Sequence, residues 1–277
     1  MDMQASIRQS LVSAKLNQHE LCLVIDGAPI EGSHYLLERW NIPYLSLFAD
    51  TPEASLVEIA PMLVPITALT SGQVNELLHW AQQTAFTFPC ISWLVTRASP
   101  QDAAKHFKHF HVIGLTDKQT LLLRWYDTRI LPIWFSCLTP SQADSFVAEI
   151  VSWHYVNRLG QVMALPLVRE PKQFPETPQM AATLINISDA QLGLLLGSAN
   201  LDELVQHLRQ VIPDETMRVP AATLFRFVGH YQQEALAAGL GDIDRQTQYV
   251  LLALYTSGKA QEQTTFAEFI KTAPKGL

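Results

Sequence analysis

One stretch of nine residues, Leu121 to Arg129, constrains the fold of this chain more than any other. Three leucines lead directly into two arginines, two aromatic residues and one aspartate, and a second apolar segment follows at once. This pattern predicts a buried strand over 120–126 that ends at a junction with a helix. Because buried charge is costly unless it is paired, the charged residues of the junction should pair with each other or with a partner; they are Arg124, Asp127 and Arg129.

Composition limits the classes of function. The chain has 277 residues, 48% of them hydrophobic and 16% charged, so it can bury a large core. Its net charge of −7 disfavours nucleic acids, which attract basic surfaces, and it disfavours anionic membranes as well. The apolar runs fall short of the roughly 20 residues that span a bilayer. The first residues include an acid and no long apolar run, so no signal peptide is expected.

Three cysteines, Cys22, Cys90 and Cys137, lie far apart in apolar surroundings. An odd number with this spacing predicts reduced thiols in a core and argues against a disulfide framework or a zinc site. Together with the missing signal peptide, this predicts a cytoplasmic protein.

Strand and helix patterns alternate over residues 1–168, which predicts an α/β domain with a mixed sheet and packed helices. We expect strands at 21–25, 44–48, 62–66, 90–96, 110–115, 120–126 and 162–168. We expect helices at 4–17, 33–40, 71–86, 99–109 and 139–150, and one that opens at Thr51-Pro52 and ends before Pro61.

The character of the chain changes after residue 168. Residues 169–180 are rich in proline and predict a linker. Residues 181–277 carry helical spacing alone and predict a separate helical domain, with helices at 188–196, 201–212, 221–238, 242–255 and 265–272.

Asp26-Gly27 follows a buried strand, a place where α/β enzymes often carry a carboxylate. The simpler interpretation, which we favour, is that Asp26 hydrogen-bonds the turn and that Gly27 supplies a positive φ. Arg124 can then pair with Asp26 or with Asp127. Asp127 or Thr128 can cap the following helix. A structural ion-pair network is favoured over an active site.

Other patterns of site chemistry are weak. The sequence has no glycine-rich phosphate loop and no GxSxG nucleophile elbow. His106 and His109 share a helix face, but His111 falls in the next strand and no carboxylate completes a metal site. We therefore expect no catalytic residue, no cofactor and no metal.

Six short motifs occur in an order that is informative as a set. They are LVIDGA (23–28), YLSLFADTPE (44–53), APMLVP (60–65), WLVTRAS (93–99), AKHFKHF (104–110) and LRWYDTR (123–129). This order resembles the effector adaptors of type VI secretion systems, also called Tap or Tec chaperones, over about residues 20–155. Three positions depart from the usual pattern: Ile25 where valine is common, Trp125 where phenylalanine is usual, and Thr128 in place of proline, which removes a fixed φ at the junction.

The resemblance implies an adaptor without enzymatic activity. Such proteins act in the cytoplasm, bind one toxic effector and help to load it onto the valine-glycine-repeat spike protein of the secretion machine. The resemblance also implies a structural or interface role for the residues of this chain that match the adaptors' motifs: Asp26, Gly27, Pro61, Arg124, Tyr126, Asp127 and Arg129.

Two other functions stay open at this point. One is an enzyme that uses the cluster of Asp26, Arg124, Asp127 and Arg129 on an anionic ligand, since arginines pair well with phosphates and carboxylates. The other is a scaffold without cargo. A spike gene and a toxin gene beside the gene for this chain would favour the adaptor.

Overall fold

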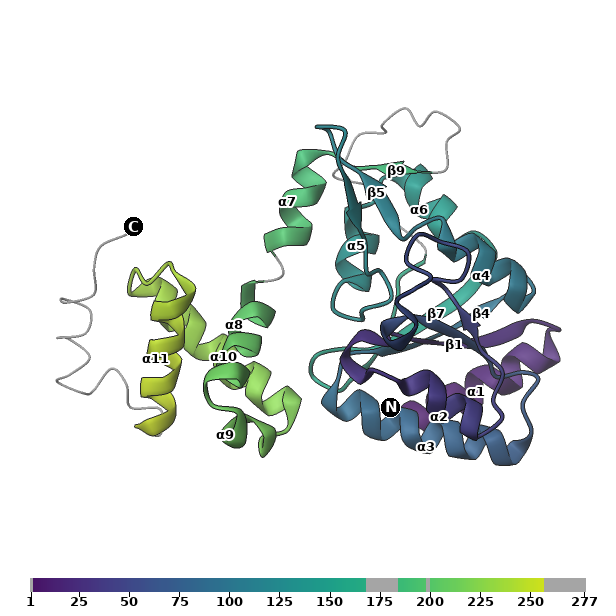
Figure 1. Ribbon diagram of the computed structural model, residues 1–277, viewed down its shortest axis with the longest axis horizontal. Coiled ribbons are helices and arrows are strands. Elements are labelled where there is room, and N and C mark those ends of the chain that lie inside the picture. Colours follow the sequence, from purple (N-terminus) through teal and green to yellow (C-terminus); the bar gives the residue numbers. More distant parts are fainter. Residues whose placement is uncertain (1, 168–183, 198–199, 257–277) are drawn as a thin grey trace. The chain divides into compact units, whose positions relative to one another are not determined.

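A six-stranded sheet, antiparallel at every pairing, forms the centre of the first part of the chain. The computed structural model describes residues 2–167, 184–197 and 200–256 (Figure 1). The strand order is β2 (Leu45–Ser46), β3 (Met62–Pro65), β1 (Glu20–Ile25), β4 (Ile91–Thr96), β7 (Ile150–Val156) and β8 (Val162–Ala164). The α/β class predicted from the sequence is confirmed.

The two faces of this sheet carry two separate cores. In β1, Cys22 and Val24 face one core, whereas Leu21, Leu23 and Ile25 face the other. This alternation follows from the period of two along a strand. Both sets are fully buried, which explains why β1 is a continuous apolar run in the sequence.

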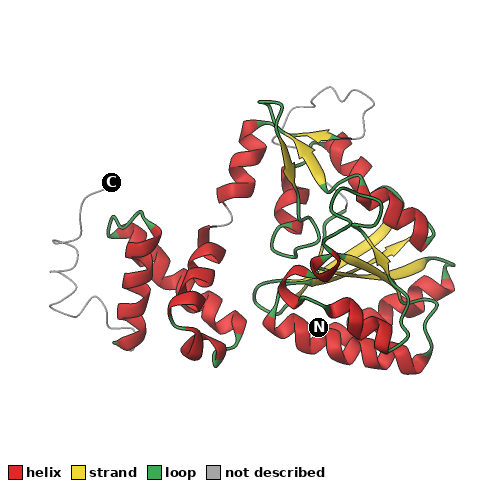
Figure 2. Ribbon diagram, viewed as in Figure 1, coloured by secondary structure: helices red, strands yellow, loops and turns green. Residues whose placement is uncertain are grey.

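Helices cover both faces of the sheet (Figure 2). On the face of Leu23 lie α1 (Met3–Leu16), α2 (Ser33–Arg39) and α3 (Ser71–Thr87), whose side chains Ile7, Leu37 and Leu77 join that core. On the face of Val24 lie α4 (Pro100–Lys108), α5 (Leu131–Cys137) and α6 (Pro140–Phe146). Ser99 and Thr139 accept hydrogen bonds from backbone N–H groups at the starts of α4 and α6, and each helix has a proline in its first turn.

A cluster of aromatic rings fills the core beneath α4 and α6. The ring of Phe107 lies 4.7 Å from Trp125 and 5.3 Å from Trp153, between ring centroids. Phe146 stacks on Trp153 at 5.6 Å. Offset and edge-to-face pairs of this kind add to the hydrophobic stabilisation of a core, so the segment around Trp125 is held firmly in place.

A second, three-stranded sheet stands beside this core. Its order is β6 (Thr120–Leu122), β5 (Val112–Gly114) and β9 (Ile185–Asn186), with β9 parallel to β5. Helix α7 (Asp189–Gly197) follows, and its Gln191 Nε2 donates to the carbonyl oxygen of Cys137 at 2.8 Å and to Gln142 Oε1 at 3.1 Å. These hydrogen bonds are buried, so β9 and α7 belong to the first part of the chain.

The chain divides into two units, Met1–Leu195 and Leu196–Leu277. The division therefore falls after the predicted linker, because β9 and α7 complete the first unit. The linker itself, 169–180, and the helix expected at 265–272 lie outside the described residues.

The described part of the second unit is helical. It contains α8 (Asn200–Val211), α9 (Pro213–Met217), α10 (Ala221–Ala237) and α11 (Ile243–Tyr255). Leu204, Leu208, Val228 and Val250 form its core, each at most 1% exposed. In α8, Leu204 and Leu208 lie four residues apart and so share one helix face.

Three local predictions were wrong. The strand expected over 120–126 is only β6, and all three of its residues are exposed. Turns and a short 3₁₀ helix, η2 (Val57–Ile59), replace the helix expected after Thr51. The helix expected over 139–150 ends at Phe146, and β7 begins at Ile150 between β4 and β8.

Candidate functional site

Asp26 lies directly after β1 and is fully buried. Its backbone N–H donates to the carbonyl oxygen of Cys90 at 2.9 Å, and its Oδ1 accepts from the Ala28 N–H at 3.1 Å. The second bond confirms that the Asp26 side chain stabilises the turn, which continues into the 3₁₀ helix η1 (Ala28–Ile30). The other carboxylate oxygen remains available for a charged partner.

Gly27 is required by close packing, and the expected positive φ was wrong. Its φ is −73° and its ψ is −22°, values that any residue adopts. A Cβ atom here would collide with the carbonyl oxygen of Ala60 and would lie 3.0 Å from the carbonyl carbon of Ile59. The turn after β1 thus presses against the backbone that enters β3. Buried Pro61 stands at that entry, and its carbonyl oxygen accepts from the Leu47 N–H at 2.8 Å.

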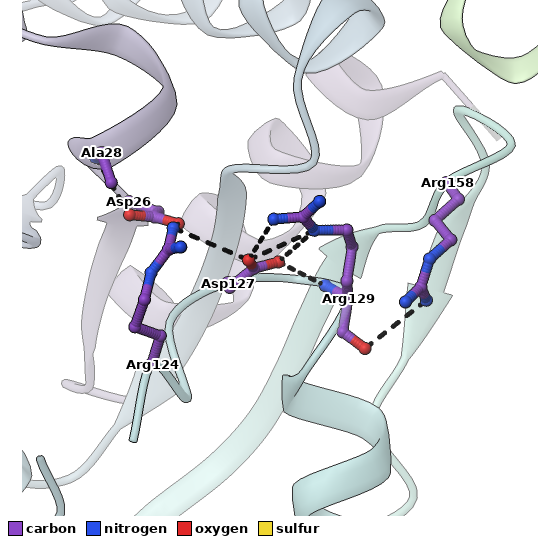
Figure 3. A network of polar contacts seen from close by, with 6 residues as sticks. All are labelled: Asp26, Ala28, Arg124, Asp127, Arg129 and Arg158. Atoms are coloured by element: carbon purple, nitrogen blue, oxygen red, sulfur yellow. Dashed lines mark hydrogen bonds and ion pairs between the residues drawn. The ribbon is translucent and has the colours of Figure 1, made fainter. Parts of the chain in front are cut away.

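Arg124 connects this turn to the 124–129 junction (Figure 3). Its Nη2 lies 2.6 Å from Asp26 Oδ2 and 3.7 Å from Asp127 Oδ2. The sequence left open whether Arg124 pairs with Asp26 or with Asp127, and the structure shows that it pairs with both. Asp26 and Arg124 are 98 positions apart in the sequence, so this ion pair joins distant parts of the chain.

Asp127 and Arg129 form the second half of the network. Arg129 Nε and Nη2 donate to the two carboxylate oxygens of Asp127, with distances of 3.0 and 2.7 Å for the shorter contacts, and the Arg129 N–H donates to Oδ1 at 2.9 Å. A forked guanidinium–carboxylate pair of this kind is both strong and directional. Arg158 Nη1 donates to the carbonyl oxygen of Arg129 at 3.5 Å and extends the network (Figure 3).

The predicted helix cap at this junction was wrong. In the described chain no side chain caps α5, whose N-cap is Ile130. The Asp127 carboxylate is engaged by Arg129 instead, while the carbonyl oxygen of Asp127 accepts from the N–H groups of Ile130 and Leu131, both at 2.9 Å.

Tyr126 belongs to the core. It is 2% exposed, and its ring packs edge-on against Phe48 at 6.2 Å and against His111 at 5.7 Å. Burial raises the pKa of its hydroxyl above the ordinary value, and Asp26 adds to the effect. Trp125 is also fully buried. Both residues lie in a turn, so the backbone does not continue here as the strand expected over 120–126.

Two acids and two arginines balance each other in charge, but they differ in exposure. The side chains of Asp26 and Asp127 are 1% and 3% exposed, whereas those of Arg124 and Arg129 are 38% and 31% exposed. Burial raises the pKa of Asp26; Arg124 opposes the shift, and Asp127 adds to it. Both buried carboxylates are thus paired with arginines, as expected for a structural ion-pair network.

The cysteines near the network are poor nucleophiles. Cys90 and Cys22 are fully buried, and burial raises the pKa of both thiols, that of Cys22 to about 12. A thiol in that range stays protonated at neutral pH, and the thiolate is the reactive form.

The three histidines singled out in the sequence have separate partners. His106 Nε2 lies 3.1 Å from the carbonyl oxygen of Phe146, and His111 Nε2 lies 2.9 Å from that of Leu47, while His109 is exposed. Among the described residues, no group of three or more His, Cys, Asp or Glu side chains is placed to hold a metal ion.

His111 should make the stability of the first unit sensitive to acid. Burial lowers its pKa from about 6.5 to about 4, so the folded state binds fewer protons than the unfolded state between these values. The stabilisation is complete above pH 6.5 and is lost as the pH falls toward 4. Between pH 7.5 and 4.5 the wild type should lose about 2–3 kcal/mol through this residue.

The measurement is urea unfolding of the wild type and of His111→Gln at both pH values. Glutamine can keep the donor to Leu47 but does not titrate, so the gap between the two proteins should shrink by that amount at pH 4.5. His109→Gln, at an exposed position, is the matched control and should follow the wild type. An unchanged gap for His111→Gln would contradict the prediction.

No helix within the described ranges combines the length and the apolar character needed to cross a bilayer. This finding concerns only 2–167, 184–197 and 200–256.

Comparison with known proteins gives one result. Residues 21–145 match the model of a family described as "Domain of unknown function (DUF4123)". No curated protein and no solved structure matches the chain. The matched range runs from β1 to α6 and contains every residue of the candidate site from Asp26 to Arg129, so the part of this chain that is similar to the family is the part that the ion-pair network holds together.

Proposed function

We propose that this protein is a cytoplasmic adaptor of a type VI secretion system. It binds one secreted effector and helps to load that effector onto the valine-glycine-repeat spike protein. The observation that carries the proposal is the match of residues 21–145 to a family associated with such adaptors. The six motifs that resemble the adaptors lie between Leu23 and Arg129, inside that match.

The geometry of the site supports a scaffold role for these motifs. Asp26, Arg124, Asp127 and Arg129 form ion pairs with each other, and Gly27 packs against the backbone before Pro61. Residues that fix one part of a chain against another serve a common architecture and do not select a cargo. We therefore propose that the protein has no enzymatic activity of its own.

Selection of the cargo then needs a surface beyond these motifs. The helical unit from Leu196 onward lies outside the range matched by the family model. It has its own core around Leu204 and Val228. We propose that this unit contributes the contacts that distinguish one effector from another, because specificity is a difference in affinity between partners.

An enzyme acting on an anionic ligand is the competing function. The observation in its favour is the partial exposure of the guanidinium groups of Arg124 and Arg129, which leaves each of them surface that a phosphate or carboxylate could approach. The deep burial of their carboxylate partners favours the adaptor, because the charges of both arginines are already balanced.

The test is affinity purification of the tagged full chain from its native cell, with the co-purified proteins identified by mass spectrometry. We expect one effector encoded beside this gene, and the spike protein in a smaller amount. An Arg8→Ala protein is a suitable matched bait, since Arg8 makes an exposed hydrogen bond to Asn75, and it should recover the same proteins. If neither effector nor spike is enriched over an untagged strain, the adaptor proposal fails and the anionic-ligand alternative gains weight.

A further inference from the structure

An exposed apolar surface lies where α2 meets the 3₁₀ helix η2. Tyr35, in the first turn of α2, is 59% exposed, and Leu56 and Val57, at the start of η2, are 44% and 50% exposed. Glu58 joins the two segments, because its Oε1 accepts from the Tyr35 hydroxyl and its carbonyl oxygen accepts from the Gly32 N–H, both at 2.9 Å. Single exposed apolar side chains are common on any protein, whereas several that lie close together are typical of an interaction surface. We call these three side chains the Tyr35 surface.

The scaffold fixes the two segments of the Tyr35 surface against each other. The turn at Gly27, directly before η1, packs so closely against the carbonyl oxygen of Ala60, directly after η2, that no Cβ atom fits between them. Gly32, between η1 and α2, has a φ of 74°, in the left-handed region that favours glycine. Its N–H bond to Glu58 joins the same two segments a second time. A surface that is ordered before binding loses less conformational entropy when a partner docks.

Three exposed carboxylates flank the Tyr35 surface: Glu31, Glu38 and Glu58. The Tyr44 hydroxyl donates to Glu38 Oε1 at 3.0 Å, as that of Tyr35 does to Glu58. A hydrogen bond from a neutral phenol leaves the negative charge of a carboxylate in place. Within the described ranges, none of the three carboxylates forms an ion pair, so their charges are not balanced by the chain itself.

The two tyrosines report a negative environment. The hydrogen bond to Glu58 and the charge of that carboxylate raise the pKa of Tyr35, and the charge of Glu38 adds to the shift. Burial raises the pKa of Tyr44 to about 12, and Glu38 again adds to it. No lysine or arginine of the described chain opposes either shift. Exposed Arg39, at the end of α2, is the nearest cation in the sequence, and one guanidinium against three carboxylates leaves an excess of negative charge.

We infer that the Tyr35 surface binds a segment of a partner protein in which apolar side chains are flanked by lysine or arginine. Apolar side chains of the partner would remove Tyr35, Leu56 and Val57 from water, and its cations would meet the unbalanced carboxylates. A second copy of this chain would instead bring like charges together, and anionic lipids or nucleic acids would be repelled. The inference rests on the proposed function and deepens it, because it names the chemistry of one partner contact on the α/β unit.

The test uses the full chain and three synthetic peptides of equal length. One is composed of leucine and lysine, the second replaces every lysine by glutamate, and the third replaces every leucine by serine. Binding is followed by the backbone amide NMR signals of Gly32 and Val57. The leucine–lysine peptide should shift both signals with a dissociation constant on the order of 100 μM. The other two peptides should bind at least tenfold more weakly, because each lacks one of the two features that the surface selects.

Two variants and two matched controls locate the site. Val57→Ser should weaken the leucine–lysine peptide about fivefold through lost apolar area. Glu58→Gln keeps the shape of the side chain and should weaken it about threefold, with the difference fading at high salt. Val12→Ser, at a position on α1 that is 60% exposed, and Glu76→Gln, at an exposed position on α3, should leave the affinity unchanged.

All four substitutions are at exposed positions, so each variant should melt within a few degrees of the wild type. Equal binding of the lysine and glutamate peptides would overturn the inference. So would an equal loss of affinity in the control variants, or peptide-induced shifts that spare Gly32 and Val57. Self-association of the full chain through these residues would overturn it as well.

These outcomes are independent of the test of the adaptor role. If the effector co-purifies with the chain but the leucine–lysine peptide leaves the signals of Gly32 and Val57 unchanged, the inference fails and the proposed function stands. If the peptide binds there but neither effector nor spike co-purifies, the proposed function fails, and the Tyr35 surface remains a site for a basic segment of another partner.

Discussion

Arg124→Ala should lower the free energy of unfolding of the first unit by about 2–4 kcal/mol, somewhat less than the roughly 3–5 kcal/mol for a fully buried ion pair, because the Arg124 side chain is 38% exposed. The physical reason is that the substitution leaves two buried carboxylates without this guanidinium. The side chains of Asp26 and Asp127 are 1% and 3% exposed, and without the guanidinium the Ala28 N–H is the one hydrogen-bond donor left to the Asp26 carboxylate among the described residues. Urea unfolding followed by tryptophan fluorescence measures the loss, because all six tryptophans lie between Trp40 and Trp153.

A second substitution separates lost charge pairing from lost packing. Asp26→Asn should destabilise the wild type but should be neutral or stabilising in the Arg124→Ala background, because it removes the unpaired charge. Residues in one network show coupling energies of about 0.5–3 kcal/mol in such cycles. Arg8→Ala, at an exposed arginine bonded to Asn75, should change stability by less than about 0.5 kcal/mol.

The opposite result has a definite meaning. If Arg124→Ala melts like the wild type and partner binding disappears, Arg124 is an interface residue, and its partial exposure matters more than its ion pairs. If Asp26→Asn destabilises both backgrounds equally, the two side chains are not coupled.

The elements that the sequence predicted well are those with a strong and complete local signal. Strand β1 is an unbroken apolar run, and α4 has a serine cap, a proline in its first turn and an apolar face. Strand β7 was missed because its pattern is irregular: exposed Val151 and half-buried His154 interrupt its buried positions. Only its place between β4 and β8 identifies it as a strand.

The residues of the candidate site could be predicted from the sequence, but the contacts between them could not. Charge and burial made pairing of Arg124 predictable, and the structure shows Asp26 and Asp127 as its partners. Which carboxylates Arg124 pairs with depends on how the end of β1 packs against residues 124–129, and local sequence patterns do not determine that packing. The need for glycine at position 27 could not be predicted either, because it arises from the close approach of the Ala60 backbone.

The hydrogen-bond partners of the histidines were not predicted. The sequence raised its histidines only as metal ligands, whereas their carbonyl partners come from the distant residues Leu47 and Phe146.

Removal of the helical unit should lower the affinity for the effector by on the order of 100-fold, or about 2.7 kcal/mol. A standard specific interface buries about 1,600 Å² in total, and binding energy concentrates in a few of its residues. If the unit from Leu196 onward selects the cargo, its loss removes such residues together with their area. The measurement compares dissociation constants of the full chain and of residues 1–197 for the co-purified effector.

The position of the cut matters. A chain that ends near Pro171, within the expected linker, would lack β9 and α7, which complete the first unit through the bonds of Gln191 to Cys137 and Gln142. Loss of binding by that shorter chain would then have two explanations. A cut after Gly197 keeps both elements, and all of the tryptophans remain, so an unchanged emission spectrum and an unchanged urea midpoint serve as controls for an intact scaffold.

Equal binding by the full chain and by residues 1–197 would place the cargo site on the α/β unit and would contradict the division of labour between the units. If instead the truncated chain loses the effector but retains the spike protein, the two partners use different units. An adaptor needs two separate surfaces in order to hold cargo and spike at the same time, and that result would place the two surfaces on different units.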